Sequence, residues 1–253
     1  STPLYSSAAS DVYKRQAEAG VLLREMDVAT QAHKMAVPAG VVSHTGIAGL
    51  TLGGGIGINM RSMGLSSDNL LSVQIVTADG KLRTANENEN TDLFWAVRGG
   101  GGNFGIVTSF TFRMHKLDSE ILSGVMVYSM ADAKDMFNRY FDYSLDAPRE
   151  LNMSAAMSLK PSGEPFLMAG FAYMGSPKEG EKVLKSYRKL GKPIADLIRP
   201  KTFLRQQTLL DAGNPHGTKY YIRGRTMDEY NPDLIDVMME KWRHSPGRHN
   251  TMR

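Results

Sequence analysis

The sequence predicts an α+β protein in two parts, and three observations support this prediction. Hydrophobic residues make up 42% and charged residues 22% of the 253 positions, which is ordinary for a globular chain and excludes disordered and fibrous classes. Glycine is dense before about residue 117 and sparse after it. The second part reads as β-α-β-β-α-α-β-α, an order that suggests an antiparallel sheet backed by helices.

The two ends of the chain do not follow this pattern. Residues 1–16 have neither a helical nor a strand period, and the stretch SSAASDVYKRQ resembles translated read-through of a sequencing adapter. We therefore expect an extraneous or disordered arm over 1–16, a first domain over 17–117 and a second domain over 118–253. The last residues are basic, contain Pro246 and Gly247 and form no closing element, so we expect the second domain to be truncated.

The first domain begins with an apolar pattern at three- and four-residue spacing, which predicts a helix from Ala19 to about His33. Alternating residues on both sides of Asp79-Gly80 predict a β-hairpin over 72–84. The other elements expected in this domain are a short helix over 90–98 and a strand over 106–113.

The second domain carries a clear helix start, with Ser176 at the N-cap, Pro177 at the first helical position and Glu179 at the third. The expected strands cover 122–128, 151–159, 166–174 and 220–227. The expected helices cover 133–140, 177–190, 202–210 and the residues after Asn231-Pro232.

Composition excludes several kinds of site. The net charge is +4 without a basic stripe, which argues against nucleic-acid and membrane-surface partners. No apolar run reaches the roughly 18 residues of a membrane span. Without cysteine there is no disulfide or thiolate site, and the six histidines lack metal-ligand spacing. We expect a soluble protein with a small-molecule partner and no metal, in the cytoplasm rather than secreted. The oligomeric state stays open.

Glycine is the informative residue. The windows 40–57 and 99–105 hold 12 of the 25 glycines. Glycine weakens regular elements, so this density implies close approach of the backbone to a ligand or to another backbone segment. Exposed amides in such loops bind phosphate oxygens, which makes a nucleotide with a pyrophosphate the first hypothesis.

Two familiar phosphate motifs fit poorly. No Gly-Lys-Ser/Thr occurs, so there is no Walker loop. Gly53–Gly57 neither follows a buried strand nor opens a long helix, as the dinucleotide fingerprint requires. A Rossmann-type nicotinamide site and a purely structural glycine loop remain as alternatives.

Three segments together resemble a known family. They are PAGVVSHTGIAGLTLGGGIG over 38–57, MGLSSDNLLS over 63–72 with VTADG over 76–80, and DLFWAVRGGGGNFGIVTS over 92–109. In this order and spacing they resemble the FAD-linked oxidases of the vanillyl-alcohol oxidase / p-cresol methylhydroxylase (PCMH) superfamily. The nearest branch looks like the bacterial berberine-bridge-enzyme-like group, and the match covers about residues 17–245.

The resemblance implies an α+β fold: the second part of a PCMH-type FAD-binding domain, followed by an antiparallel-sheet substrate domain backed by helices. It implies FAD as the cofactor. The glycine loop would run along the flavin and the pyrophosphate, and backbone groups of Ile106 and Val107 would recognise the adenine end. The cofactor-binding residues carried over from the loop are Gly40, Ser43, His44, Thr45, Gly46, Gly49, Leu50, Gly53, Gly54, Gly55 and Gly57.

This sequence departs from the family pattern in two ways. Relatives with a doubly attached flavin carry cysteine at the position of Val42, so a cysteinyl link is impossible here. The family's first FAD subdomain, with its phosphate loop and the histidine that commonly bonds the flavin, would precede residue 17. The fragment alone is therefore expected to bind FAD poorly or to be inactive.

The implied activity of the parent protein is hydride removal from a C–H beside an alcohol or amine of a small molecule, with O2 as acceptor. The alternative is a non-catalytic or degenerate nucleotide-binding module. On the substrate side, Tyr221 and Arg223 share one face of the expected strand over 220–227 and are the candidates to line a pocket. Solvent exposure of that face is the competing interpretation.

Overall fold

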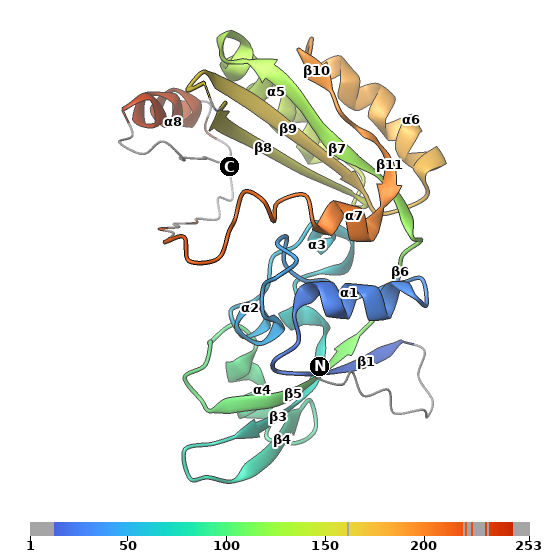
Figure 1. Cartoon of the computed structure of the whole chain (residues 1–253), viewed down its shortest axis with the longest axis vertical. Coiled ribbons are helices and arrows are strands. Elements are labelled where there is room, and N and C mark those ends of the chain that lie inside the picture. Colours follow the sequence, from blue (N-terminus) through green and yellow to red (C-terminus); the bar gives the residue numbers. More distant parts are fainter. Residues whose placement is uncertain are drawn as a thin grey trace. The chain divides into compact units, whose positions relative to one another are not determined.

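The computed structural model describes residues 13–160, 162–219, 221, 224, 231 and 233–244, and these form two compact units (Figure 1). Unit 1 contains residues 13–120 and 202–216. Unit 2 contains residues 121–201 and the described residues from Gly217 onward. The predicted α+β class is confirmed, because each unit combines an antiparallel sheet with helices.

Unit 1 is built on a four-stranded antiparallel sheet in the order β1-β5-β3-β4. Its strands are β1 (Lys14–Glu18), β3 (Leu70–Val76), β4 (Leu82–Asn86) and β5 (Ile106–Arg113). The predicted hairpin is confirmed as β3 and β4, which pair from Ser72↔Asn86 to Val76↔Leu82. A separate pair joins β2 (Met35–Ala36) to β6 (His115–Lys116).

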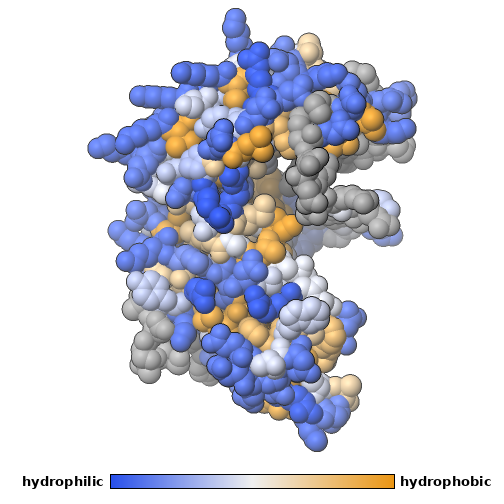
Figure 2. Space-filling view, turned by 180° about the vertical axis from the view of Figure 1, so that it is seen from behind, coloured by the Kyte–Doolittle hydropathy of each residue, from blue (hydrophilic) through white to orange (hydrophobic). Residues whose placement is uncertain are grey.

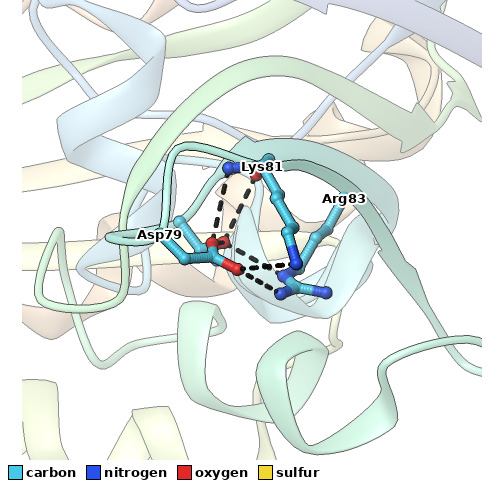
Figure 3. A network of polar contacts seen from close by, with 4 residues as sticks. Asp79, Lys81 and Arg83 are labelled. Carbon is cyan, nitrogen blue, oxygen red and sulfur yellow. Dashed lines mark hydrogen bonds and ion pairs between the residues drawn. The ribbon is translucent and has the colours of Figure 1, made fainter.

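The turn of this hairpin is held by one carboxylate (Figure 3). Asp79 accepts hydrogen bonds from the Thr77 hydroxyl at 2.6 Å, from the Lys81 amide at 3.4 Å and from the Arg83 guanidinium at 2.7 Å. The Thr77 bond is the largest of several causes that lower the pKa of Asp79 below its ordinary value. The tight Asp79-Gly80 turn is therefore stabilised by side chains from one segment of seven residues, Thr77 to Arg83.

One face of the unit 1 sheet forms the core. Alternate residues of a strand point to the same face, and here those residues are apolar. Ala17, Val73, Ile75, Phe110 and Phe112 are all buried and belong to one cluster with apolar residues of the helices. The helices of unit 1 are α1 (Leu23–Gln31), α2 (Ile47–Leu52), α3 (Met60–Met63), the 3-10 turn η1 (Ser67–Asn69), α4 (Thr91–Val97) and α7 (Phe203–Gln207).

The expected arm over 1–16 overlaps this sheet. Lys14, Arg15 and Gln16 pair with β5 as part of β1, so the folded domain begins before residue 17. The strand is five residues long and buries only Ala17 fully, which is too little alternation to produce a readable period. The predicted helix start at Ala19 is also wrong: the Ala19 amide donates to the Thr108 carbonyl and prolongs the sheet, and α1 begins at Leu23.

The placement of residues 202–216 also differs from the prediction. The helix expected there exists as α7, but it belongs to unit 1 rather than to the second domain. Phe203 and Gln207 are its buried residues, and the Phe203 amide donates to the Ser119 carbonyl at 2.9 Å. Segment 202–216 therefore packs in unit 1, because Phe203 and Gln207 are buried there, although the neighbouring residues of the sequence belong to unit 2.

Unit 2 is built on a five-stranded antiparallel sheet in the order β10-β7-β9-β8, with β11 also paired to β7. Its strands are β7 (Glu120–Ser129), β8 (Leu151–Leu159), β9 (Pro165–Tyr173), β10 (Ala195–Asp196) and β11 (Arg199–Thr202). Register is continuous from Leu151↔Tyr173 to Leu159↔Pro165 between β8 and β9, as the two predicted strands require.

Three helices share the core of unit 2: α5 (Ala133–Asp146), α6 (Pro177–Tyr187) and α8 (Asp233–Arg243). The short turns η2 (Met130–Asp132) and η3 (Arg188–Leu190) flank α5 and α6. The predicted N-cap is confirmed: the Ser176 hydroxyl accepts from the Glu179 amide, and Pro177 is the first helical residue. Most of the expected strand over 220–227 lies outside the described residues.

Figure 2 shows one face of the molecule, on which hydrophilic side chains predominate and hydrophobic ones form smaller patches. Within the described ranges, no helix combines the length and the apolar character needed to cross a membrane. Among the large hydrophobic side chains that are exposed in unit 1 are Ile56, Trp95, Phe104 and Ile106. All four lie in or beside the two glycine-rich windows.

Candidate functional site

The glycine-rich segment after β2 folds onto the start of α1. The first amides of a helix lack partners inside the helix. Here the Leu23 amide donates to the Thr45 carbonyl at 3.0 Å, and the Arg24 amide donates to the Ser43 carbonyl at 2.9 Å. The Ile47 amide in turn donates to the Val21 carbonyl at 2.9 Å. Carbonyl groups of the loop therefore accept hydrogen bonds from the first amides of α1, and these bonds hold the loop against the start of that helix.

Three glycines of the segment are buried for packing reasons. Gly40, Gly55 and Gly57 all lie inside unit 1. A Cβ at Gly57 would collide with the Ala39 carbonyl, and one at Gly55, where φ is +80°, would collide with the Ser66 side chain. A Cβ at Gly40 would press on Leu23 and Leu50 at 3.0 and 3.1 Å. Gly55 and Gly57 are therefore required by packing whatever the ligand, whereas a side chain at Gly40 would need Leu23 and Leu50 to shift.

A second set of glycines is exposed and has a different character. Gly46, Gly49 and Gly53 stand at i, i+3 and i+7 along α2, so they share one face of that helix. A Cβ at Gly46 or Gly49 would meet nothing within 4 Å. Gly54, with φ of +108°, also faces open space. Helix α2 thus presents a side-chain-free face along these glycines, bordered by the half-buried Leu50, while Ile47, Thr51 and Leu52 anchor its other side in the core.

Two of the polar loop residues predicted to bind the cofactor, Ser43 and His44, contact residues 208–216, a segment that the sequence analysis placed in the second domain. Ser43 is 3% exposed, and both its amide and its hydroxyl donate to the Asp211 carboxylate, at 2.8 and 2.7 Å. The ring of His44 lies 4.3 Å from that of His216. Thr45 and Leu50 are half-buried. Ser43 and His44 are therefore brought together with residues 208–216.

The start of β5 has an open edge. Strand β1 pairs with β5 only from Ser109 to Arg113, and the Ala19 amide reaches the Thr108 carbonyl. Ile106 and Val107 pair with β3 alone, at Val76 and Ile75, so within the described chain no strand covers their other side. An uncovered strand edge leaves backbone donors and acceptors for a ligand. Ile106 is 74% exposed, whereas Val107 is buried.

The second glycine window adjoins α2. The Gly101 amide donates to the Leu52 carbonyl at 2.9 Å and so joins residues 99–105 to the end of that helix. A Cβ at Gly105, where φ is +144°, would collide with the Val76 carbonyl, which explains the close approach of β5 to β3. Beside this window lies an open cavity of about 410 Å³. It is lined by Trp95, Ala96, Arg98, Gly99, Gly100 and Phe104.

A buried polar pair lies beneath the loop. The Gln207 side-chain amide donates to the Asp27 carboxylate at 3.1 Å and to the Gly40 carbonyl at 3.2 Å. Asp27 is 1% exposed, and burial raises its pKa to about 7, an effect that the Gln207 bond partly opposes. No cation neutralises Asp27 in the hydrogen bonds and ion pairs of the described residues. Sequence reasoning missed this pair, because no local pattern marks it.

The geometry of unit 1 fits a protein that binds a nucleotide cofactor. A helix face without side chains, glycine turns at its end and an open strand edge allow a flat, extended nucleotide cofactor to approach the backbone closely. No group of three or more histidine, aspartate or glutamate side chains with metal-binding geometry occurs in the described part of the chain. The residues present therefore fit a cofactor such as FAD, held mainly by main-chain groups.

The sequence comparisons agree with this class. Residues 13–86 match the family described as FAD binding domain. A FAD-linked oxidoreductase from Dictyostelium discoideum is 36% identical over 234 residues, which cover 91% of this chain and 50% of the relative. An uncharacterized FAD-linked oxidoreductase, YgaK, from Bacillus subtilis is 31% identical over 77% of this chain and 44% of its own length.

Solved structures have the same fold. BBE-like 1 from Physcomitrella patens, in its D396N variant, superposes with a TM-score of 0.69 at 30% identity, over 88% of this chain and 46% of that protein. Xylooligosaccharide oxidase from Myceliophthora thermophila reaches a TM-score of 0.75 at 23% identity, over 92% of this chain and 51% of that protein. This second likeness concerns the fold alone.

Over most of its length the chain is homologous to FAD-linked oxidoreductases, residues 13–86 match a FAD-binding domain, and the cofactor is FAD. The resemblance in the sequence is thus confirmed, except for the bacterial branch: bacterial and eukaryotic relatives both match, so this assignment gains no support. The chain spans about half the length of the curated relatives that it matches.

The substrate-side candidates are in unit 2. Tyr221 is 82% exposed. Arg223 lies outside the described residues, so the shared face expected for the two side chains stays a prediction.

Proposed function

We propose that the complete protein is an FAD-dependent oxidoreductase that removes a hydride from a C–H beside an alcohol or amine of a small molecule, with O2 as the acceptor. When bound, the flavin supplies the hydride-accepting chemistry, and the protein supplies orientation and electrostatics. The observation that carries the proposal is the side-chain-free face of α2 in a chain whose relatives are FAD-linked oxidoreductases.

Each part of unit 1 has a role in this proposal. Gly46, Gly49, Gly53 and Gly54 admit the cofactor to the backbone, because no side chain stands between. Gly40, Gly55 and Gly57 shape the loop from inside. The edge at Ile106 and Val107 offers peptide groups to the adenine end. Ser43 would act through the loop, since its amide and hydroxyl are engaged with Asp211, and His44, beside His216, stays a candidate for contact with the cofactor.

The substrate side is proposed to include two residues of unit 2. Tyr221 would stack on the substrate or hydrogen-bond it, and Arg223 would hold a carboxylate or offset negative charge that develops in the reaction. The exposure of Tyr221 is compatible with this role.

The test uses the full-length protein that contains this chain. We expect it to purify with visible flavin absorbance, to be bleached under anaerobic conditions by at least one member of an alcohol and amine panel, and to recover its colour when O2 is admitted. Absence of bound flavin would overturn the proposal. Flavin that no panel member bleaches would favour the degenerate nucleotide-binding module. Bleaching without recovery in O2 would point to a dehydrogenase with another acceptor.

A further inference from the structure

Residues 202–216 leave unit 2, pack in unit 1 and lead back into unit 2; this segment is called the excursion. Both flanks of this segment belong to unit 2, whereas the segment itself belongs to unit 1. Its start is well fixed: the Thr202 hydroxyl caps α7 by accepting from the Arg205 amide at 3.2 Å, and Phe203 is 1% exposed. The excursion therefore brings a short capped helix and the turn after it into unit 1.

The excursion contacts the first turn of the glycine loop at three points. The Gln207 amide donates to the Gly40 carbonyl, the Asp211 carboxylate accepts twice from Ser43, and the His216 ring lies against the His44 ring at an angle of 43°. These contacts fall on residues 40–44, immediately before α2. All three side chains come from one segment of 15 residues.

Hydrogen bonds hold Ser43 through both its backbone amide and its backbone carbonyl. Its amide and hydroxyl donate to Asp211, while its carbonyl accepts from the Arg24 amide at the start of α1. Hydrogen bonds to a carboxylate are shorter and stronger than those between neutral groups. Because Ser43 is buried, its amide would be left without a partner if the carboxylate were removed, and that arrangement is costly.

We propose that Asp211, assisted by Gln207, is a positioning residue that clamps residues 40–44 and so sets the orientation of the side-chain-free face of α2. Glycine-rich backbone loses much conformational freedom when it is ordered, so a bond that fixes it in advance favours cofactor binding. This inference rests on the proposed function, because the clamped face is the one assigned to the flavin. Asp211 would act on the cofactor through Ser43 and the loop that it holds.

The experiment compares three variants of the full-length protein. Asp211→Ala removes both acceptors. Asp211→Asn keeps both bonds, since the carboxamide oxygen accepts from the Ser43 amide and its NH2 donates to the Ser43 hydroxyl. Asp79→Ala is the matched control, because Asp79 also accepts from a hydroxyl and an amide of unit 1 but lies in the β3–β4 turn. The readouts are hydrogen exchange of the Ser43 amide, flavin content and kcat and KM.

For Asp211→Ala we expect Ser43 exchange to accelerate by about tenfold or more, a change of roughly 1.4 kcal/mol, with lower flavin content. Any flavin retained should give reduced kcat at little changed KM. Asp211→Asn should restore all three readouts to near wild-type values. Asp79→Ala should leave them unchanged.

Three results would overturn the proposal that Asp211 positions residues 40–44. They are unchanged Ser43 exchange in Asp211→Ala, an Asp211→Asn variant as impaired as the alanine, or an Asp79→Ala variant that loses flavin equally. If Asp211→Ala does not fold, Ser43→Ala removes the hydroxyl bond alone and should give a partial effect, and no effect would count against the clamp. Failure of the proposed function is distinct, because the wild-type protein would then lack flavin while Ser43 exchange still responded to Asp211.

Discussion

The Asp27 carboxylate accepts a hydrogen bond of 3.1 Å from the Gln207 side chain, across a separation of 180 residues in the chain. The bond ties α1 to α7 inside unit 1, and within the described residues no basic side chain forms a hydrogen bond or an ion pair with this acid. A carboxyl group in such surroundings favours its protonated form. This relationship makes the stability of unit 1 dependent on pH.

We predict that stability falls as pH rises from about 4 to about 7. The pKa of Asp27 is about 7 in the folded protein and near 3.8 in the unfolded chain, so in this window the folded state binds the extra proton. Its contribution is complete below the unfolded pKa and is lost as pH rises through the folded pKa. The slope is at most about 1.4 kcal/mol per pH unit. Urea unfolding at pH 5 and pH 7 measures it, and Asp27→Asn should abolish the Asp27 part of the difference.

The two sets of glycines predict opposite phenotypes. Gly49→Val places its side chain in open space and replaces a poor helix former, so we expect normal folding with loss of flavin. Gly57→Val meets the Ala39 carbonyl, so we expect loss of the folded protein itself. Flavin absorbance and thermal unfolding separate the two outcomes. Stoichiometric flavin in Gly49→Val would remove α2 from the cofactor site.

The N-cap of α6 allows a test that is independent of any cofactor. Ser176→Ala removes the acceptor for the Glu179 amide and should destabilise unit 2 by about 1 kcal/mol. Ser162→Ala, in the turn between β8 and β9, is the matched control and should stay within about 0.5 kcal/mol of wild type. Thermal unfolding measures both. Equal effects of the two substitutions would contradict the capping role.

The substrate side is tested by Tyr221→Phe and Arg223→Met in the full-length protein. We expect flavin content to stay constant and kcat/KM to drop by about tenfold or more in each variant, equivalent to roughly 1.4 kcal/mol of transition-state stabilisation. The measurement must pair turnover with flavin content. Wild-type kcat/KM in both variants would show that these side chains do not line the active site.

Sequence patterns correctly predicted the elements that are stabilised by interactions between neighbouring residues. The β3–β4 hairpin and the start of α6 depend on residues within a few positions of one another, and both are confirmed. Helix α2 was missed because Gly46, Gly49 and Gly53 disfavour helix, yet burial of Ile47 and Thr51 four positions apart outweighs that cost. The four-residue spacing of Ile47 and Thr51 was the feature of the sequence that could have predicted this helix.

The clamp on the loop could not be predicted in the same way. Asp211 meets Ser43 across 168 residues, and Gln207 meets Gly40 across 167. Neither residue belongs to a motif, and both lie in a stretch that the helix and strand pattern assigns to the second domain. Without an alignment or a structure, nothing in the sequence connects such distant polar residues.

The excursion of residues 202–216 also governs the order in which the protein forms during synthesis. Unit 1 is discontinuous, so the ribosome must complete residues 121–201 before the last piece of unit 1 emerges. Until then, Asp27 lacks the Gln207 amide and Ser43 lacks the Asp211 carboxylate. A nascent chain that ends at Glu120 therefore cannot reach the native form of unit 1, and the maturation of the glycine loop is delayed until all five strands of the unit 2 sheet have been translated.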